Sequence, residues 1–249
     1  MLKKLIVITI LSMGTLVAGT INIAVAANVS YAMDSLKKEF NLLHRDTKVN
    51  VTLGSSGKLT AQIKHGAPYQ LFMSANMLYP ETLYRDGIAT TKPKVYAQGA
   101  LALLSSKKQN FSKGIILLED ATIAKIAVAN PKTAPYGKAG IEAIKSSGVY
   151  KNIKNKLVFA ESISQTVSYT VTATDIGIIA KSSLYSPKMA QFKQDIHWIE
   201  IAPKLYQPIS QGIVILKNGE TNSEVKAFYD FILSQKAKKI LMDFGYLVP

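Results

Sequence analysis

Four short segments of this chain place hydroxyl or amide side chains beside glycine or proline, where an apolar run gives way to a helical pattern. They are residues 27–30 (ANVS), 54–57 (GSSG), 130–137 (NPKTAPYG) and 161–166 (ESISQT). At such strand-to-helix junctions the backbone N–H groups that start the helix point outward and attract an anion. One loop of this kind is commonly just a turn, but four of them predict a site for a small anion.

The charges near these segments indicate how the anion would be held. None of the four segments contains arginine, and Lys58 and Lys132 supply the only formal positive charge in or beside them. We therefore expect neutral donors in a dry cleft, where each hydrogen bond to an ionised acceptor contributes roughly 1.5–3 kcal/mol. The glycine-rich loop ending in lysine and serine or threonine, which binds nucleotide triphosphates, is missing.

The same side chains also suit helix caps. Asn28 and Ser30 are good N-cap types, so a cap explains them about as well as a ligand contact does. Ser55 and Ser56 together exceed what one cap requires, which favours a ligand. We expect Glu161 to serve the helix start rather than the anion, because a carboxylate repels an anion.

Catalytic patterns are weak in comparison. The three histidines are His44, His65 and His197, and neither a zinc motif of the HExxH kind nor a GxSxG nucleophile elbow is present. A periplasmic hydrolase that pairs Ser56 with His65 is the remaining enzymatic alternative. We predict a binding protein and not an enzyme.

The elements that position these junctions alternate between strand and helix almost from end to end. Strand patterns occupy residues 21–27, 49–53, 70–74, 125–129, 157–159, 176–180 and 196–201, and helical patterns occupy residues 31–43, 58–65, 78–85, 138–145 and 165–172. Such alternation predicts an α/β fold with mostly parallel sheets flanked by helices. In sheets of this kind ligands gather at the carboxyl ends of the strands, where all four segments lie.

Two segments that cross between lobes divide the chain. Residues 96–104 read as a strand that crosses from one lobe to another, and residues 206–215 read as the return. They predict a discontinuous lobe one, residues 19–97 plus 207–249, and a continuous lobe two, residues 98–206. Two C-terminal helices, the first capped by Thr221 or Asn222, are expected to pack on lobe one.

The first residues and the composition indicate the compartment. Residues 1–18 contain two lysines, then an apolar run, and then a cleavage-site pattern that ends in the small residue Ala18. This is the order of a secretory signal peptide cleaved near Ala18. Cysteine is absent, so neither disulfides nor thiolate metal sites form. The net charge is +14, but its lysines are scattered without arginine–aromatic interleaving, so a nucleic-acid partner is not expected.

Taken in order, several motifs of this chain resemble those of the periplasmic molybdate-binding proteins of ABC transporters. The resemblance covers essentially the whole mature chain and is carried by residues 26–28 (AAN), 54–57 (GSSG), 66–75 (GAPYQLFMSA), 130–137 (NPKTAPYG), 161–166 (ESISQT), 175–178 (DIGI) and 225–231 (VKAFYDF). It implies a two-lobed, type II periplasmic-binding-protein fold that closes on molybdate or tungstate. A carrier of sulfate or another oxyanion with the same fold is the alternative.

The resemblance also implies a set of site residues. The oxygens of the ion, not the metal itself, would contact the side chains of Asn28 and Ser56 and the backbone N–H groups of Tyr136 and Ile163, with Ala27 and Ser55 beside them. Some members place a tyrosine that contacts the ion where this chain has Ala180. The contacts that such a tyrosine would make are expected from Asn28 instead. The implied protein is a periplasmic monomer without a cofactor that delivers its ion to a permease in the inner membrane.

Overall fold

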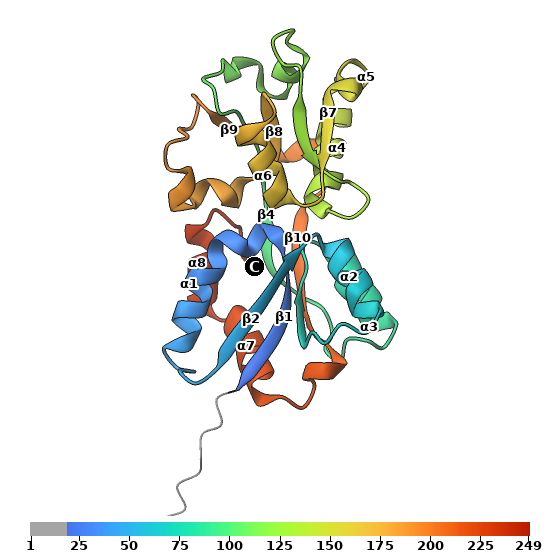
Figure 1. The fold of residues 1–249 in the computed structure, drawn as a ribbon, viewed down its shortest axis with the longest axis vertical. Helices are drawn as coiled ribbons and strands as arrows, with labels where there is room; N and C mark the ends of the chain where they lie inside the picture. Colours follow the sequence, from blue (N-terminus) through green and yellow to red (C-terminus); the bar gives the residue numbers. More distant parts are fainter. Residues whose placement is uncertain (1–18) are drawn as a thin grey trace, which may run out of the picture.

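The computed structural model describes residues 19–249, so the predicted signal peptide lies outside the described residues. Two five-stranded sheets stand one above the other (Figure 1). The first sheet has the order β2 (Lys48–Gly54), β1 (Thr20–Ala26), β3 (Leu71–Met73), β10 (Ile209–Ile215) and β4 (Lys94–Gly99). The second has the order β7 (Leu157–Ala160), β6 (Ile126–Ala129), β8 (Ile176–Ala180), β5 (Leu101–Leu104) and β9 (Trp198–Glu200). We call the two sheets with their helices lobe one and lobe two.

Both sheets are mixed. In lobe one, β1 pairs in parallel with β2 and β3, whereas β10 is antiparallel to β3 and β4. In lobe two, β6 pairs in parallel with β7 and β8, whereas β5 is antiparallel to β8 and β9. The predicted α/β fold with two helix-flanked sheets is confirmed, and one reversed strand in each sheet qualifies the expectation of mostly parallel pairing.

The predicted crossing strand, residues 96–104, is not one strand. It is divided at Ala100 into β4, which pairs with β10 in lobe one, and β5, which pairs with β8 and β9 in lobe two. Gln98 and Gly99 interrupt the apolar run just before this point, but the division itself depends on pairing partners that lie far away in the sequence. The return connection leads into β10, whose first residue, Ile209, pairs with Gly99 at the end of β4. The two crossings between the lobes therefore lie side by side.

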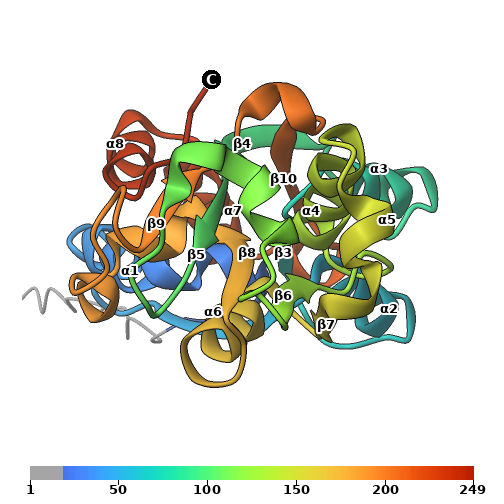
Figure 2. The ribbon, with the colours of Figure 1, turned by 90° about the horizontal axis from the view of Figure 1, so that it is seen from above.

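Helices cover both faces of each sheet (Figures 1 and 2). In lobe one, α1 (Ser30–Asn41), α7 (Ser223–Ile232) and α8 (Gln235–Asp243) share one apolar core, while α2 (Ser56–Lys64) and α3 (Leu78–Arg85) share another. In lobe two, α4 (Pro135–Ser146) and α5 (Tyr150–Ile153) lie on one side and α6 (Ile163–Thr172) lies on the other. The two C-terminal helices therefore pack on lobe one as predicted, and Asn222 caps the first of them.

Alternating side chains explain why both faces of a sheet are covered. In β8, a Cβ on Gly177 would fall 1.8 Å from Oγ1 of Thr170 in α6, whereas Ile178 lies beside Gly140 of α4. Successive residues of a strand point to opposite faces, so one apolar strand supplies two cores. Among residues 19–249, no helix combines the length and the apolar character that crossing a bilayer requires.

Candidate functional site

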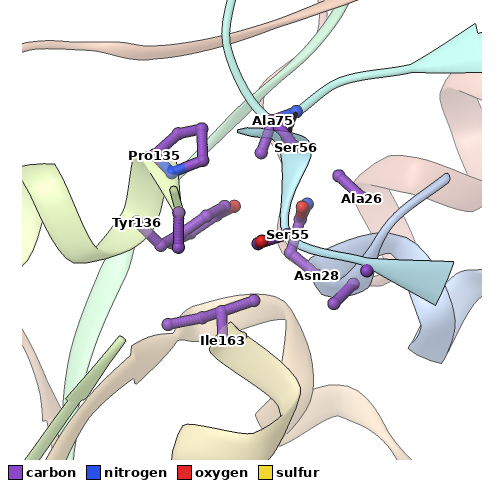
Figure 3. Close-up of a pocket in the computed structure, with 11 residues that line it drawn as sticks. Ala26, Asn28, Ser55, Ser56, Ala75, Pro135, Tyr136 and Ile163 are labelled. Atoms are coloured by element: carbon purple, nitrogen blue, oxygen red, sulfur yellow. Dashed lines mark hydrogen bonds between the residues drawn. The ribbon is translucent and has the colours of Figure 1, made fainter. Parts of the chain in front are cut away.

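The predicted junctions converge on one small cavity between the lobes (Figure 3). Its lining comprises Ala26, Ala27, Asn28, Gly54, Ser55, Ser56, Ala75, Ala134, Pro135, Tyr136 and Ile163. All six predicted site residues are in this set, although their role as ligand contacts stays a prediction. Every lining residue is uncharged. Ala180, where some relatives of the implied family have tyrosine, lies in the core of lobe two instead.

Two serine hydroxyls come from lobe one, at the start of α2. Ser55 occupies the N-cap position with extended backbone, φ −68° and ψ 144°, yet its side chain makes no cap hydrogen bond. Its Oγ is buried and has no partner among residues 19–249. The Oγ of Ser56 accepts a hydrogen bond from the backbone N–H of Ala75 at 2.9 Å, which leaves its own proton free to donate. Both hydroxyl protons are available to an acceptor in the cavity.

Two helix starts come from lobe two. Pro135 is the first residue of α4 and has no N–H, so the first N–H of this helix belongs to Tyr136. Ile163 is the first residue of α6, after Ser162, whose Oγ caps Gln165. The first N–H groups of a helix have no partner within it and carry its positive dipole end. Lobe two therefore presents backbone donors where lobe one presents hydroxyls.

Asn28 differs from expectation in one respect. It is fully buried in a short 3-10 turn (Ala27–Val29) and lines the cavity. Its Nδ2 donates to Oε1 of Gln211 at 2.8 Å and to Oη of Tyr246 at 2.9 Å, and Oη of Tyr246 donates to the carbonyl oxygen of Asn28 at 2.9 Å. Its Oδ1 has no partner among residues 19–249. The predicted donation from this side chain to an anion thus requires the amide to turn over.

A buried polar network supports these groups from below. Gln211 Oε1 also accepts from Oη of Tyr96 at 2.9 Å, and Gln211 Nε2 donates to Oη of Tyr136 at 3.2 Å. Burial raises the pKa of Tyr96 and of Tyr136 well above the usual range and raises the pKa of Tyr246 to about 12. The three phenols are therefore neutral at pH 7, and none of them repels an anion. Sequence reasoning missed Tyr96, Tyr246 and Gln211; the available signal was a lone amide inside the apolar strand β10.

The loops of the two lobes also contact each other directly. The N–H of Gly57 donates to the carbonyl oxygen of Thr133 at 2.9 Å, and Oγ of Ser164 donates to the carbonyl oxygen of Ala27 at 3.0 Å. A Cβ at Gly57 would lie 2.9 Å from that Thr133 oxygen, so this approach requires glycine. At the exposed edge, Lys58 pairs with Glu161 at 2.6 Å. The two lobes are closed over the cavity.

The geometry removes the Ser56–His65 pair on which the hydrolase alternative depends. The two residues lie at opposite ends of α2, about 13 Å apart along its axis. His65 is exposed, and Ser56 is buried at the cavity. Across residues 19–249, no cluster of His, Asp or Glu has the arrangement of a metal site.

Comparison with known proteins adds independent information. The model of the family described as bacterial extracellular solute-binding protein matches residues 21–247. The chain is 32% identical over 233 residues to the molybdate-binding protein ModA of Azotobacter vinelandii, covering 92% of this chain and 90% of the relative. It is 33% identical to ModA of Rhodobacter capsulatus, covering 92% and 89%. The structure of the A. vinelandii periplasmic molybdate-binding protein superposes with a TM-score of 0.84 and 30% identity, covering 92% of this chain and 99% of that one.

Proposed function

Because the chain belongs to the family of bacterial extracellular solute-binding proteins, we propose that it binds molybdate or tungstate between its lobes for an ABC importer. One observation carries the choice of an oxyanion: a closed, uncharged cavity receives unpaired donors from both lobes. Ser55 and Ser56 supply hydroxyl protons from one side, and the first N–H groups of α4 and α6 supply backbone donors from the other. A compact anion with oxygens on all sides accepts from both lobes at once.

Size then separates the tetrahedral dianions. Molybdate, tungstate and sulfate carry the same charge, but the Mo–O and W–O bonds are longer than the S–O bond. Donors fixed to helix starts and packed loops cannot follow the smaller ion, so sulfate loses or strains hydrogen bonds. Each bond to a charged acceptor contributes about 1.5–3 kcal/mol, so the loss of one bond changes the affinity tenfold or more.

The remaining parts of the proposal concern the cellular role. Residues 1–18 act as a signal peptide cleaved near Ala18, and the mature protein works in the periplasm as a monomer. Its partner is the permease of an ABC transporter in the inner membrane, to which it presents the loaded, closed form. It binds its ion without a cofactor and without converting it chemically.

Titration calorimetry of the purified protein with molybdate, tungstate, sulfate and phosphate tests the proposal. We expect tight binding of molybdate and tungstate and poor binding of sulfate and phosphate. Equal affinity for sulfate would replace the proposed ligand with a general oxyanion, and failure to bind all four ions would reject an oxyanion carrier. For variants that remove a serine hydroxyl from the cavity, Ser168→Ala is the matched control, because it removes an exposed hydroxyl of α6.

A further inference from the structure

Gln211 is a fully buried amide on β10, the strand that returns from lobe two to lobe one. Ile209 and Ile213, two positions away on either side, belong to apolar cores, and the strand pairing shifts between Gln211 and Gly212. A buried amide is retained only where its hydrogen bonds are made. Those of Gln211 reach Asn28 in the first loop, Tyr96 in β4 and Tyr136 in lobe two, so one side chain links both walls of the cavity.

The direction of these bonds decides which end of the Asn28 amide is free. Gln211 Oε1 is an acceptor, so it holds the NH2 of Asn28 and leaves Oδ1 as the end without a partner. An acceptor cannot bind an oxyanion. If the Asn28 amide turned over alone, its Oδ1 would face Oε1 of Gln211, and two acceptors would be placed against each other.

The conflict disappears when both amides turn over together. Nε2 of Gln211 then donates to Oδ1 of Asn28, and the NH2 of Asn28 becomes the free end. Oε1 of Gln211 takes the proton of Tyr136 Oη, which in the present arrangement accepts from Nε2. Tyr96 has a second acceptor within reach, because its Oη lies 3.4 Å from the carbonyl oxygen of Ser74 as well as 2.9 Å from Gln211. Oη of Tyr246, which in the present arrangement accepts from Nδ2 of Asn28, turns its proton from the carbonyl oxygen of Asn28 to Oδ1. That carbonyl oxygen keeps Oγ of Ser182, at 3.3 Å, as a donor. Each phenol only redirects its proton, so no charge is created.

We propose that Gln211 is a positioning residue that determines whether Asn28 presents an oxygen or an N–H to the cavity. This inference rests on the proposed function. Because Gln211 also donates a hydrogen bond to Tyr136 of lobe two, the orientation of the Asn28 amide is coupled to the position of lobe two relative to lobe one. Gly99 keeps that contact open: a Cβ there would fall 1.9 Å from Oη of Tyr136 and 3.0 Å from Nε2 of Gln211.

Two substitutions separate this role from simple packing. Gln211→Leu removes the partner that fixes the orientation of Asn28, because the remaining partner, the hydroxyl of Tyr246, can either donate or accept. We expect molybdate affinity to fall about tenfold, the effect of one hydrogen bond to a charged acceptor. In the background of Asn28→Ala, the same substitution should have little further effect, since its action passes through Asn28. A residue that only packs would lower the affinity by the same factor in both backgrounds, and that result would overturn the inference.

Gln211→Glu provides a second readout that does not depend on the leucine variant folding. The ionised carboxylate has no N–H, so it fixes Asn28 with its oxygen toward the cavity and adds a negative charge. Burial and the bound anion both favour the protonated acid, which regains a donor. We expect its molybdate affinity to be at least about tenfold weaker at pH 8 and to recover toward pH 5.5, while that of wild type stays flat.

Gln207→Glu is the charge-matched control, because Gln207 is exposed four residues earlier in the chain. Calorimetry with molybdate on all variants, together with melting of the unliganded proteins, completes the experiment. Wild-type molybdate affinity in the Gln211→Leu variant, together with wild-type affinity of the Gln211→Glu variant across this pH range, would refute the positioning role. Wild-type protein that fails to bind molybdate would instead reject the proposed function, so the two failures are distinguishable.

Discussion

Ser55→Ala tests the site most directly, because the structure separates its effect on binding from its effect on folding. Ser55 is only 4% exposed and occupies the N-cap position of α2. Its hydroxyl makes no hydrogen bond to residues 19–249. A buried hydroxyl without a partner destabilises the empty protein by about 1–3 kcal/mol. Such an arrangement is stabilised only when an acceptor enters the cavity.

The expected magnitudes follow from that geometry. Alanine removes a buried hydroxyl that has no partner in the empty protein, so the free energy of unfolding of the empty protein should rise, by up to about 3 kcal/mol. Binding loses one hydrogen bond to a charged acceptor, about 1.5–3 kcal/mol, which weakens the affinity roughly ten- to over a hundredfold. A residue that merely capped the helix would behave in the opposite way, because a lost cap costs about 1 kcal/mol of stability and leaves affinity intact.

Calorimetry with molybdate and thermal melting of the unliganded protein measure the two quantities on the same sample. Ser168→Ala, in an exposed part of α6, controls for loss of a serine hydroxyl in general. A lower melting temperature with unchanged affinity would assign Ser55 to capping. Unchanged affinity together with unchanged melting would remove Ser55 from the site altogether.

Three further outcomes are expected. Ser56→Ala should lower both the affinity for molybdate and the stability of the unliganded protein. The stability should fall by about 1–3 kcal/mol because the buried N–H of Ala75 loses its acceptor. Calorimetry measures the affinity and chemical unfolding measures the stability, and a change in only one of them contradicts the double role. Gly99→Ala should weaken molybdate binding, since its Cβ would collide with Oη of Tyr136; wild-type affinity in calorimetry would show that this contact is unnecessary. The melting temperature should fall as the pH rises from 10 toward 12. Burial raises the pKa of Tyr246 to about 12 in the folded protein, whereas the phenol ionises near pH 10 in the unfolded protein, so the unfolded state releases this proton first. A flat profile of melting temperature against pH would contradict the burial of this phenol.

Local sequence patterns predicted most elements within a few residues. The helix pattern at 78–85 matches α3, and the strand patterns near 21–27 and 176–180 match β1 and β8, because hydrophobic periodicity and capping residues act over short distances. The division of residues 96–104 into β4 and β5 was not predictable in this way. It depends on pairing with β8 and β10, whose paired residues lie between 73 and 119 positions further along the chain.

The site shows the same contrast. The six predicted residues stand at strand-to-helix junctions, so a rule about the carboxyl ends of strands is enough to bring them together. The network beneath them joins residues that no local pattern relates: Asn28 bonds Gln211 across 183 positions and Tyr246 across 218. Only the closed fold shows that the Asn28 amide is already engaged by these partners.

Closure and selectivity depend on the same loops. The contacts that join the lobes, Gly57 to Thr133 and Ser164 to Ala27, lie within or beside the segments that line the cavity. An ion too large for the cavity would lengthen these contacts, whereas an ion too small would leave the serine hydroxyls and helix starts beyond hydrogen-bond distance. Because every lining residue is uncharged, ions of equal charge differ in affinity through this geometry alone. The affinity should therefore follow the length of the bond from the central atom to oxygen more closely than the charge of the ion.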